Sequence, residues 1–291
     1  MMRFTKYAAV IAAAGALVLA GCSNGGTAPA EETEAPVAED VTFEAGTTMA
    51  KLHDAGKITV GTKFDQPLFG LKGLDGNPEG FDVEIAKIIA GELGIDAGDI
   101  EWKEAVSANR EPFIENGEVD IVVATYTIND KRKEVISFAG PYYLAGQDIL
   151  VLQGNPEGIE SIEDLEGKKA CSVTGSTSAQ NLKDRGVEVM ETDTYSNCLT
   201  PLRQGEVVAV STDNVILAGL ADQNPGEFEV VDNPFTEEPY GIGLAKDDEA
   251  FRTFINDTLE AAFADGRWAQ AWESTAGTVL STPTPPTLDR Y

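Results

Sequence analysis

One segment of the sequence gathers the residue types that bind a carboxylate group. Residues 125–132 (Thr-Tyr-Thr-Ile-Asn-Asp-Lys-Arg) follow an apolar run that is typical of a buried strand, and they lead into a predicted helix. Arginine presents a planar bidentate fork to a carboxylate, and the free N–H groups where a helix begins add charge-assisted hydrogen bonds. We therefore expect Thr125, Thr127 and Arg132 to take part in an anion site.

Two segments in the second half of the chain carry complementary chemistry. Gly175, Ser176 and Thr177 form a turn of small residues that opens a predicted helix, which again favours an anion. Asp213 follows a later apolar strand, where its carboxylate suits an ammonium group. The same position permits a simpler role for Asp213, as the N-cap of the next helix.

These residues lie at the ends of strands in a chain where strands and helices alternate. Such alternation is typical of α/β units around mostly parallel sheets, and ligands bind at the carboxyl ends of these strands. Residues 116–125 and 204–213 are weakly similar, which predicts two similar halves that face one cleft. The expected strands are 57–61, 100–102, 119–124, 168–173, 187–191 and 207–211, and the expected helices are 81–93 (with Asp82 as its N-cap), 107–116, 176–185, 195–204 and 213–221.

The composition disfavours several classes of partner. The chain has 291 residues, and its 21 Lys+Arg against 49 Asp+Glu give a formal net charge of -28. Such an acidic surface repels nucleic-acid phosphates and anionic lipid headgroups. With a single histidine, His53, and three cysteines, a His-based catalytic triad or a His-rich metal site is also disfavoured. We expect no nucleic acid, no metal and no cofactor.

The first 45 residues predict export and anchoring. A signal peptide is expected over residues 1–21, because Arg3 and Lys6 precede an apolar stretch that is too short to span a bilayer. Leu-Ala-Gly-Cys at 19–22 resembles the bacterial lipoprotein signal, which makes Cys22 a lipid anchor at the outer face of the cell membrane. The alternative is an ordinary secretory signal with a chance cysteine. Residues 22–45, from Cys22 onward, are expected to form a flexible acidic tether.

The other two cysteines, Cys171 and Cys198, lie beyond this export signal. In an oxidising compartment an even pair favours a disulfide, which stabilises by about 3 kcal/mol through the lost entropy of the unfolded chain. Two buried free thiols are the alternative.

Several motifs taken together resemble a known family, the polar amino-acid-binding proteins of ABC importers (bacterial solute-binding proteins, family 3). The resemblance covers residues from about 57 to 277. More narrowly, Lys-Phe-Asp-Gln-Pro at 63–67 and Ser-Ala-Asn-Arg-Glu-Pro at 107–112 are similar to the glutamate-binding branch. The motifs are Gly-Phe-Asp at 80–82, Asn-Gly-Glu-Val-Asp at 116–120, Arg132 followed by Phe138 and Pro-Tyr-Tyr at 141–143, Gly-Ser-Thr at 175–177, and Gly205 with Asp213.

This resemblance implies a two-lobed α/β fold of the type II periplasmic-binding-protein class, whose lobes are joined by two hinge strands. The first lobe would comprise residues 46–145 plus 236–291, and the second lobe residues 146–235. The crossing strands are expected near 143–151 and 235–243.

The resemblance also implies where a ligand's backbone groups are bound. Arg132 and Thr127 would take the α-carboxylate, with Thr125 nearby. Ser176 and Thr177 would close on the same carboxylate from the second lobe.

The remaining positions would bind the ammonium group and the ligand side chain. Asp213 would accept the α-ammonium. Arg110, with Ser107, matches the position that reads a side-chain carboxylate. Lys63 falls where acidic-amino-acid binders carry another cation, and Tyr195 falls where some carry a histidine, so these two details depart from the family pattern.

Two of the arginines also have simpler interpretations. Arg110 could be a surface residue paired with Glu111 or Glu115, and Arg132 could belong to the solvated run of basic residues at 131–133.

The expected function is capture of L-glutamate by a monomeric, lipid-anchored receptor that delivers it to the membrane subunits of an ABC permease. Hinge closure around the ligand would shift the open–closed equilibrium. Alternatives of the same class are binders of glutamine, aspartate or another polar amino acid. Alternatives of another class are a dehydratase-type enzyme on the same fold and a sensory ligand-binding module; we expect a binding protein rather than an enzyme.

Overall fold

The computed structural model describes residues 36–291, which belong to the compact unit Glu34–Tyr291. The expected signal peptide, the lipidation site at Cys22 and the first part of the tether lie outside the described residues. Within residues 36–291, no helix is long and apolar enough to cross a bilayer.

The first of two five-stranded sheets has the strand order β5-β1-β6-β13-β7. Its first three strands are parallel, as the alternation of strands and helices predicts. Strand β13 pairs in the antiparallel direction with both of its neighbours, β6 and β7. The strands are β1 (Ile58–Thr62), β5 (Ile100–Glu104), β6 (Ile121–Val122), β7 (Ser137–Ala145) and β13 (Glu238–Leu244). The accompanying helices are α1 (Thr48–Ala55), α2 (Phe81–Glu92), α3 (Arg110–Glu115), α4 (Asp130–Lys133), α8 (Glu249–Asp265) and α9 (Arg267–Ser274).

The second sheet repeats this plan with the order β10-β9-β11-β8-β12, in which β10, β9 and β11 are parallel. Its strands are β8 (Gln147–Leu152), β9 (Lys169–Val173), β10 (Glu188–Thr192), β11 (Ala209–Asp213) and β12 (Phe228–Val230). Its helices are α5 (Thr177–Asp184), α6 (Leu199–Gln204) and α7 (Asn214–Asp222). A small third sheet, β2 (Asp65–Gln66), β3 (Gly70–Lys72) and β4 (Pro78–Glu79), accompanies the first.

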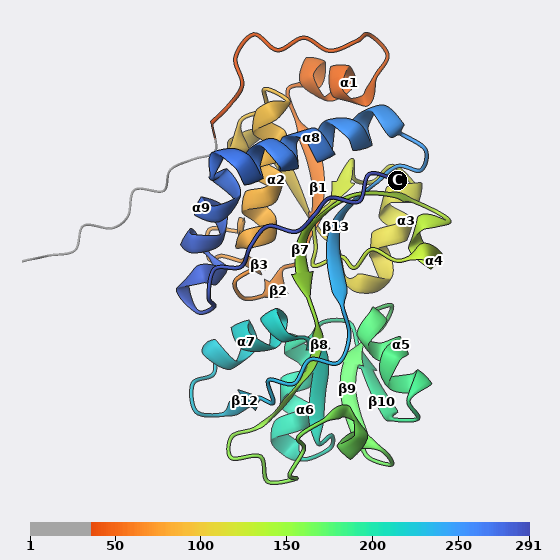
Figure 1. The fold of residues 1–291 in the computed structure, drawn as a ribbon, viewed down its shortest axis with the longest axis vertical. Coiled ribbons are helices and arrows are strands. Elements are labelled where there is room, and N and C mark those ends of the chain that lie inside the picture. The colour runs from red at the N-terminus through yellow and green to blue at the C-terminus, as the bar shows by residue number, and fades with distance from the viewer. Residues whose placement is uncertain (1–35) are drawn as a thin grey trace, which may run out of the picture. The chain divides into compact units, whose positions relative to one another are not determined.

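Two chain segments run between the sheets side by side (Figure 1). The first passes from β7 through Gly146 into β8. The second leads into β13, and Phe235 N–H donates to Gln147 O over 2.9 Å where the two segments meet. We propose that the lobes divide at these crossings, with residues 46–145 plus 236–291 in one lobe and 146–235 in the other.

Two local expectations differ from the structure. The strand expected at 119–124 is shorter, and only β6 is regular, although Asp120 N–H and Val123 N–H still donate to Thr59 O and Gly61 O; the chain turns away at Thr125, whose φ is 44°. Residues 36–45, expected to be part of the tether, contact the fold: Ala38 N–H donates to Gly91 O over 2.9 Å, and the Phe43 ring lies edge-on to Phe254. A hydrophobic partner for Phe43 explains this difference.

A cluster of buried aromatic side chains packs between the first sheet and the helices α2 and α9. Tyr142 and Tyr240 are both fully buried, and α9 contributes Trp268, whose Nε1 donates to Tyr142 O over 2.9 Å. Phe69 and Phe81 complete the packing with edge-on contacts. This cluster holds the two tyrosine hydroxyls in place for the buried carboxylates described below.

The predicted disulfide is confirmed. Cys171 in β9 is bonded to Cys198, and their Cα atoms lie 5.6 Å apart. The bond ties the central part of the second sheet to the start of α6 and closes a loop with a sequence separation of 27 residues.

Candidate functional site

A small cavity lies where the strand ends of the two sheets face one another. Its wall is mostly polar. Eight of the ten predicted ligand-binding positions line it: Ser107, Arg110, Thr125, Thr127, Ser176, Thr177, Tyr195 and Asp213. Ser178 and Ile216 also line the cavity and were not predicted, although Ser178 continues the run of small residues that begins α5.

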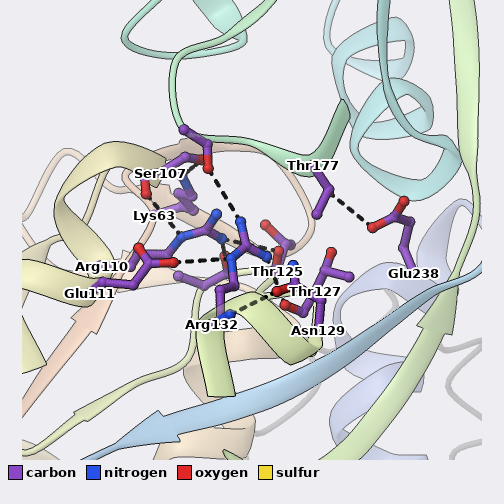
Figure 2. Close-up of polar contacts among 12 residues, drawn as sticks. Lys63, Ser107, Arg110, Glu111, Thr125, Thr127, Asn129, Arg132, Thr177 and Glu238 are labelled. Atoms are coloured by element: carbon purple, nitrogen blue, oxygen red, sulfur yellow. Dashed lines mark hydrogen bonds and ion pairs between the residues drawn. The ribbon is translucent and has the colours of Figure 1, made fainter. Parts of the chain in front are cut away.

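The other two predicted positions, Lys63 and Arg132, contact residues of the cavity wall. Lys63 Nζ donates to Ser107 Oγ over 2.9 Å (Figure 2). Arg132 donates to Thr127 O over 2.7 Å and to Glu111 Oε1 over 3.0 Å. Since the Arg132 residue is only 6% exposed, the alternative of a solvated basic run is wrong for this residue.

Arg110 is buried at the cavity wall. Its guanidinium lies over the Tyr126 ring, 4.1 Å from the centroid, and donates to Ala124 O and Thr125 O over 3.0 and 3.3 Å. In the described part of the chain its hydrogen bonds all go to backbone carbonyl oxygens. The alternative of a surface ion pair is therefore wrong, and Glu111 pairs with Arg132 instead.

The three cations repel one another. Burial first, and then the charge of Arg110, lower the pKa of Lys63 to about 7. Burial and Arg110 also lower the pKa of Arg132. Buried cations are stable only when they are paired with anions or hydrogen-bond acceptors. A ligand with two carboxylates would relieve this repulsion.

Asp213, at the end of β11, contributes an acidic side chain to the cavity wall on the side of the second sheet. Tyr240 Oη donates to Asp213 Oδ2 over 2.7 Å, and within residues 36–291 the buried Oδ1 atom has no hydrogen-bond partner. Burial, followed by the charge of Glu238, raises the pKa of Asp213 to about 7. A carboxylate oxygen that faces a cavity without a donor suits an ammonium ligand. Asp213 is also the N-cap residue of α7 by position, as the alternative expected, but its side chain makes no cap hydrogen bond.

The side chains of Ser176 and Thr177 are used differently from the expectation. Ser176 is the N-cap of α5, since its Oγ accepts from Ala179 N–H over 2.9 Å. Thr177 Oγ1 donates to Glu238 Oε2 over 2.9 Å (Figure 2). Both hydroxyls are thus bonded within the protein. What this turn can offer an anion is the free backbone N–H groups at the start of α5.

Two buried carboxylates near the site were not predicted to lie there. Asp82, expected to cap α2, instead accepts from Thr125 N–H over 2.7 Å and from Tyr142 Oη over 2.6 Å, while Gly80 occupies the N-cap. Asp82 therefore holds Thr125 in its left-handed conformation. Glu238, at the start of β13, is 3% exposed. The sequence could have indicated Glu238 through its position on a predicted hinge strand, two residues before Tyr240.

Tyr195 lies in the cavity wall with only 4% of its surface exposed. Burial, and then the charge of Asp213, raise its pKa, so this side chain is a neutral hydrogen-bonding group. It cannot supply the positive charge that a histidine would.

The two sheets and their helices approach closely around the cavity. Arg132 donates to Gly175 O over 3.2 Å, which joins α4 to the turn before α5. A Cβ atom added to Gly175 would lie 2.8 Å from Ala108 Cα, and one added to Gly219 would lie 2.6 Å from Pro67 O. Glycine at these positions permits the close approach.

Comparison with known proteins identifies the family. Residues 58–275 match the bacterial extracellular solute-binding proteins, family 3. The chain belongs to this family. It is 45% identical over 235 residues to the glutamate-binding protein GluB of Corynebacterium efficiens, with 77% of this chain and 80% of the relative covered.

Other similar proteins bind related ligands. The chain is 40% identical to the ABC transporter glutamine-binding protein GlnH of Bacillus subtilis, over 78% of this chain and 83% of the relative. Among solved structures, an ancestral arginine-binding protein bound to glutamine is 38% identical, with a TM-score of 0.71 over 76% of this chain and 97% of the other. These likenesses confirm the two-lobed type II binding-protein fold that the sequence predicted.

Proposed function

We propose that this protein captures L-glutamate in the cavity between its two lobes. The observation that carries the proposal is the arrangement of three buried cations, Lys63, Arg110 and Arg132, opposite the partner-free oxygen of Asp213. One α-carboxylate needs a single arginine, so the other two cations suit a second carboxylate at the far end of the ligand.

The ligand's backbone groups would bind as follows. Arg132 and the backbone and hydroxyl groups of Thr127 and Thr125 take the α-carboxylate. The free N–H groups at the start of α5, at Thr177 and Ser178, approach it from the other lobe. Asp213 accepts the ammonium group.

The side-chain carboxylate would bind to Arg110, Ser107 and Lys63. Lys63 and Ser107 already share a hydrogen bond of 2.9 Å, so the ligand carboxylate would meet two donors that are positioned together. Tyr195 contributes a neutral contact. A glutamine side chain would leave two cations without an anion, which is the physical reason to expect a preference for glutamate.

The transport setting follows from the family and from the N-terminal sequence. We propose that Cys22 carries the lipid, which is the protein's attachment to the membrane, and that the monomeric receptor presents glutamate to ABC permease subunits. Contacts of the ligand with both lobes would favour the closed form, because only that form brings the two walls together.

The enzyme alternative requires a general acid beside the ligand. Among the described residues that line the cavity, Asp213 is the carboxylate, and the proposal assigns it to the ammonium group. The family and the relatives named above are binding proteins, which favours binding as the function.

Calorimetry on the protein with L-glutamate and L-glutamine tests the proposal. We expect glutamate to bind more tightly, and Arg110→Ala to weaken glutamate binding by about 2 to 5 kcal/mol and to remove the preference, because Lys63 and Arg110 then no longer act together. Arg203→Ala, which truncates an exposed arginine on α6, is the matched control. Equal affinity for the two ligands in the unsubstituted protein would contradict the proposal.

A further inference from the structure

Two side chains on the hinge strand β13 point toward the ammonium side of the cavity. Glu238 and Tyr240 are two residues apart, so they share one face of the strand. Tyr240 bonds Asp213 over 2.7 Å, and Glu238 bonds Thr177, which lines the same cavity, over 2.9 Å. The strand therefore places a second carboxylate behind the wall that Asp213 forms.

The Glu238 carboxylate is held by donors. Thr177 Oγ1 donates to Oε2, whereas Thr236 Oγ1 and Asn181 Nδ2 donate to Oε1 over 2.9 and 3.4 Å. Among the described residues, these donors are all uncharged and Glu238 forms no ion pair. Figure 2 shows it on the far side of Thr177 from the arginines.

We propose that Glu238 is a specificity-determining residue, which makes the protein prefer a ligand with an ammonium group over a dicarboxylate of the same length without one. This inference rests on the proposed binding of glutamate. Glu238 acts through its charge from behind Asp213 and Thr177 and does not line the cavity itself.

The three cations on the other side of the cavity explain why such a residue is needed. Lys63, Arg110 and Arg132 attract any dicarboxylate, with or without an ammonium group. Discrimination must therefore come from negative charge on the other wall, which attracts ammonium and repels a bare anion. The Glu238 charge contributes, after burial, to the raised pKa of Asp213.

The test compares L-glutamate with glutarate, which is glutamate without its ammonium group. Affinities for both are measured by calorimetry on the protein and on Glu238→Gln, at a pH above 7 where Asp213 is ionised. We expect Glu238→Gln to weaken glutamate binding by about tenfold or more, a factor that corresponds to about 1.4 kcal/mol. Glutarate should bind the variant as well as or better than the unsubstituted protein.

Two matched variants isolate the charge of Glu238. Glu237→Gln removes an exposed carboxylate from the adjacent position and should leave the ratio of the two affinities unchanged. Glu238→Asp keeps the charge and should retain most of the discrimination. Should Glu238→Gln fail to fold, Glu238→Ala removes the same charge with a smaller side chain and should change the ratio in the same direction.

The outcomes are distinct. Equal weakening of glutamate and glutarate would show a structural role for Glu238 and overturn the inference, as would an unchanged ratio. If the unsubstituted protein binds glutarate but no amino acid, both the proposed function and this inference are wrong. If it binds glutamate normally and only the effect of Glu238→Gln is missing, the proposed function stands and the inference fails.

Discussion

Tyr240 and Asp213 share a hydrogen bond of 2.7 Å between two buried side chains, one from the hinge strand β13 and one from the end of β11. The bond favours the ionised carboxylate, while burial opposes it, and the pKa of Asp213 is about 7. The protonation state of the ammonium acceptor therefore changes within the physiological pH range.

We predict that glutamate affinity falls as the pH drops below about 7. In the free protein Asp213 then takes up a proton, which must leave before the ammonium group binds, so affinity decreases by about tenfold per pH unit. Calorimetry in buffers of different ionisation enthalpy should detect release of this proton. The other charged or titratable groups around Asp213 are Glu238, Tyr240, Arg110, Arg132, Tyr143 and Tyr195.

Tyr240→Phe is the control for this loss of affinity below about pH 7, which is the acid limb of the pH profile. The variant loses the donor that favours ionised Asp213, so the limb should move to higher pH. An acid limb that stays in place, or an affinity that is constant from about pH 5 to pH 7, would show that Asp213 does not control binding.

Lys63 should cause a second change of glutamate affinity with pH, on the alkaline side of the profile. Its pKa of about 7 means that the free protein loses this positive charge as the pH rises, and glutamate binding must then restore the proton. We predict that glutamate affinity declines above about pH 7 while glutamine affinity declines less, because a neutral side chain gains little from Lys63. The charged groups around Lys63 are Arg110, Arg132, Asp65 and Asp82.

Lys63→Arg tests the origin of this alkaline limb. Arginine stays charged throughout the accessible pH range, so the decline should disappear even if the overall affinity changes. Persistence of the same decline in this variant would assign it to another group.

A third prediction concerns closure of the lobes. Gly219 lies in α7, and a Cβ atom there would approach Pro67 O to 2.6 Å. Gly219→Ala should weaken glutamate binding although the residue lies away from the cavity wall, because the approach of the lobes is obstructed. The free protein should keep its stability or gain up to about 1 kcal/mol, since alanine favours a helix interior over glycine.

Gly98→Ala is the matched control for Gly219→Ala, because no atom lies within 4 Å of its added Cβ. Affinity is measured by calorimetry and stability by denaturant unfolding. Unchanged affinity in Gly219→Ala would mean that the contact between α7 and the segment at Pro67 is not part of the ligand-bound form.

Much of the framework could be predicted from local patterns. Apolar runs and helical spacing predicted the strand and helix order of both sheets, and the two cysteines beyond the export signal predicted their disulfide. Asp213 was predicted from its place after a strand, whereas Arg110 was predicted from the resemblance to the family. These features are encoded within short stretches of chain, so a single sequence is enough to find them.

The partners of the polar side chains could not be predicted in this way. Asp82 was expected to cap its own helix, yet it bonds Thr125, 43 residues away, and Thr177 bonds Glu238, 61 residues away. Local spacing carries no information about contacts across such distances.

The sequence by itself determined the α/β order, the family and most of the residues around the cavity. The tertiary structure alone decided which hydroxyls are already bonded, which carboxylate stands behind Asp213, and which cations share a buried space. The physical reason is that burial and the charges of distant neighbours set a side chain's hydrogen bonds and protonation, and both arise only when the two sheets face one another.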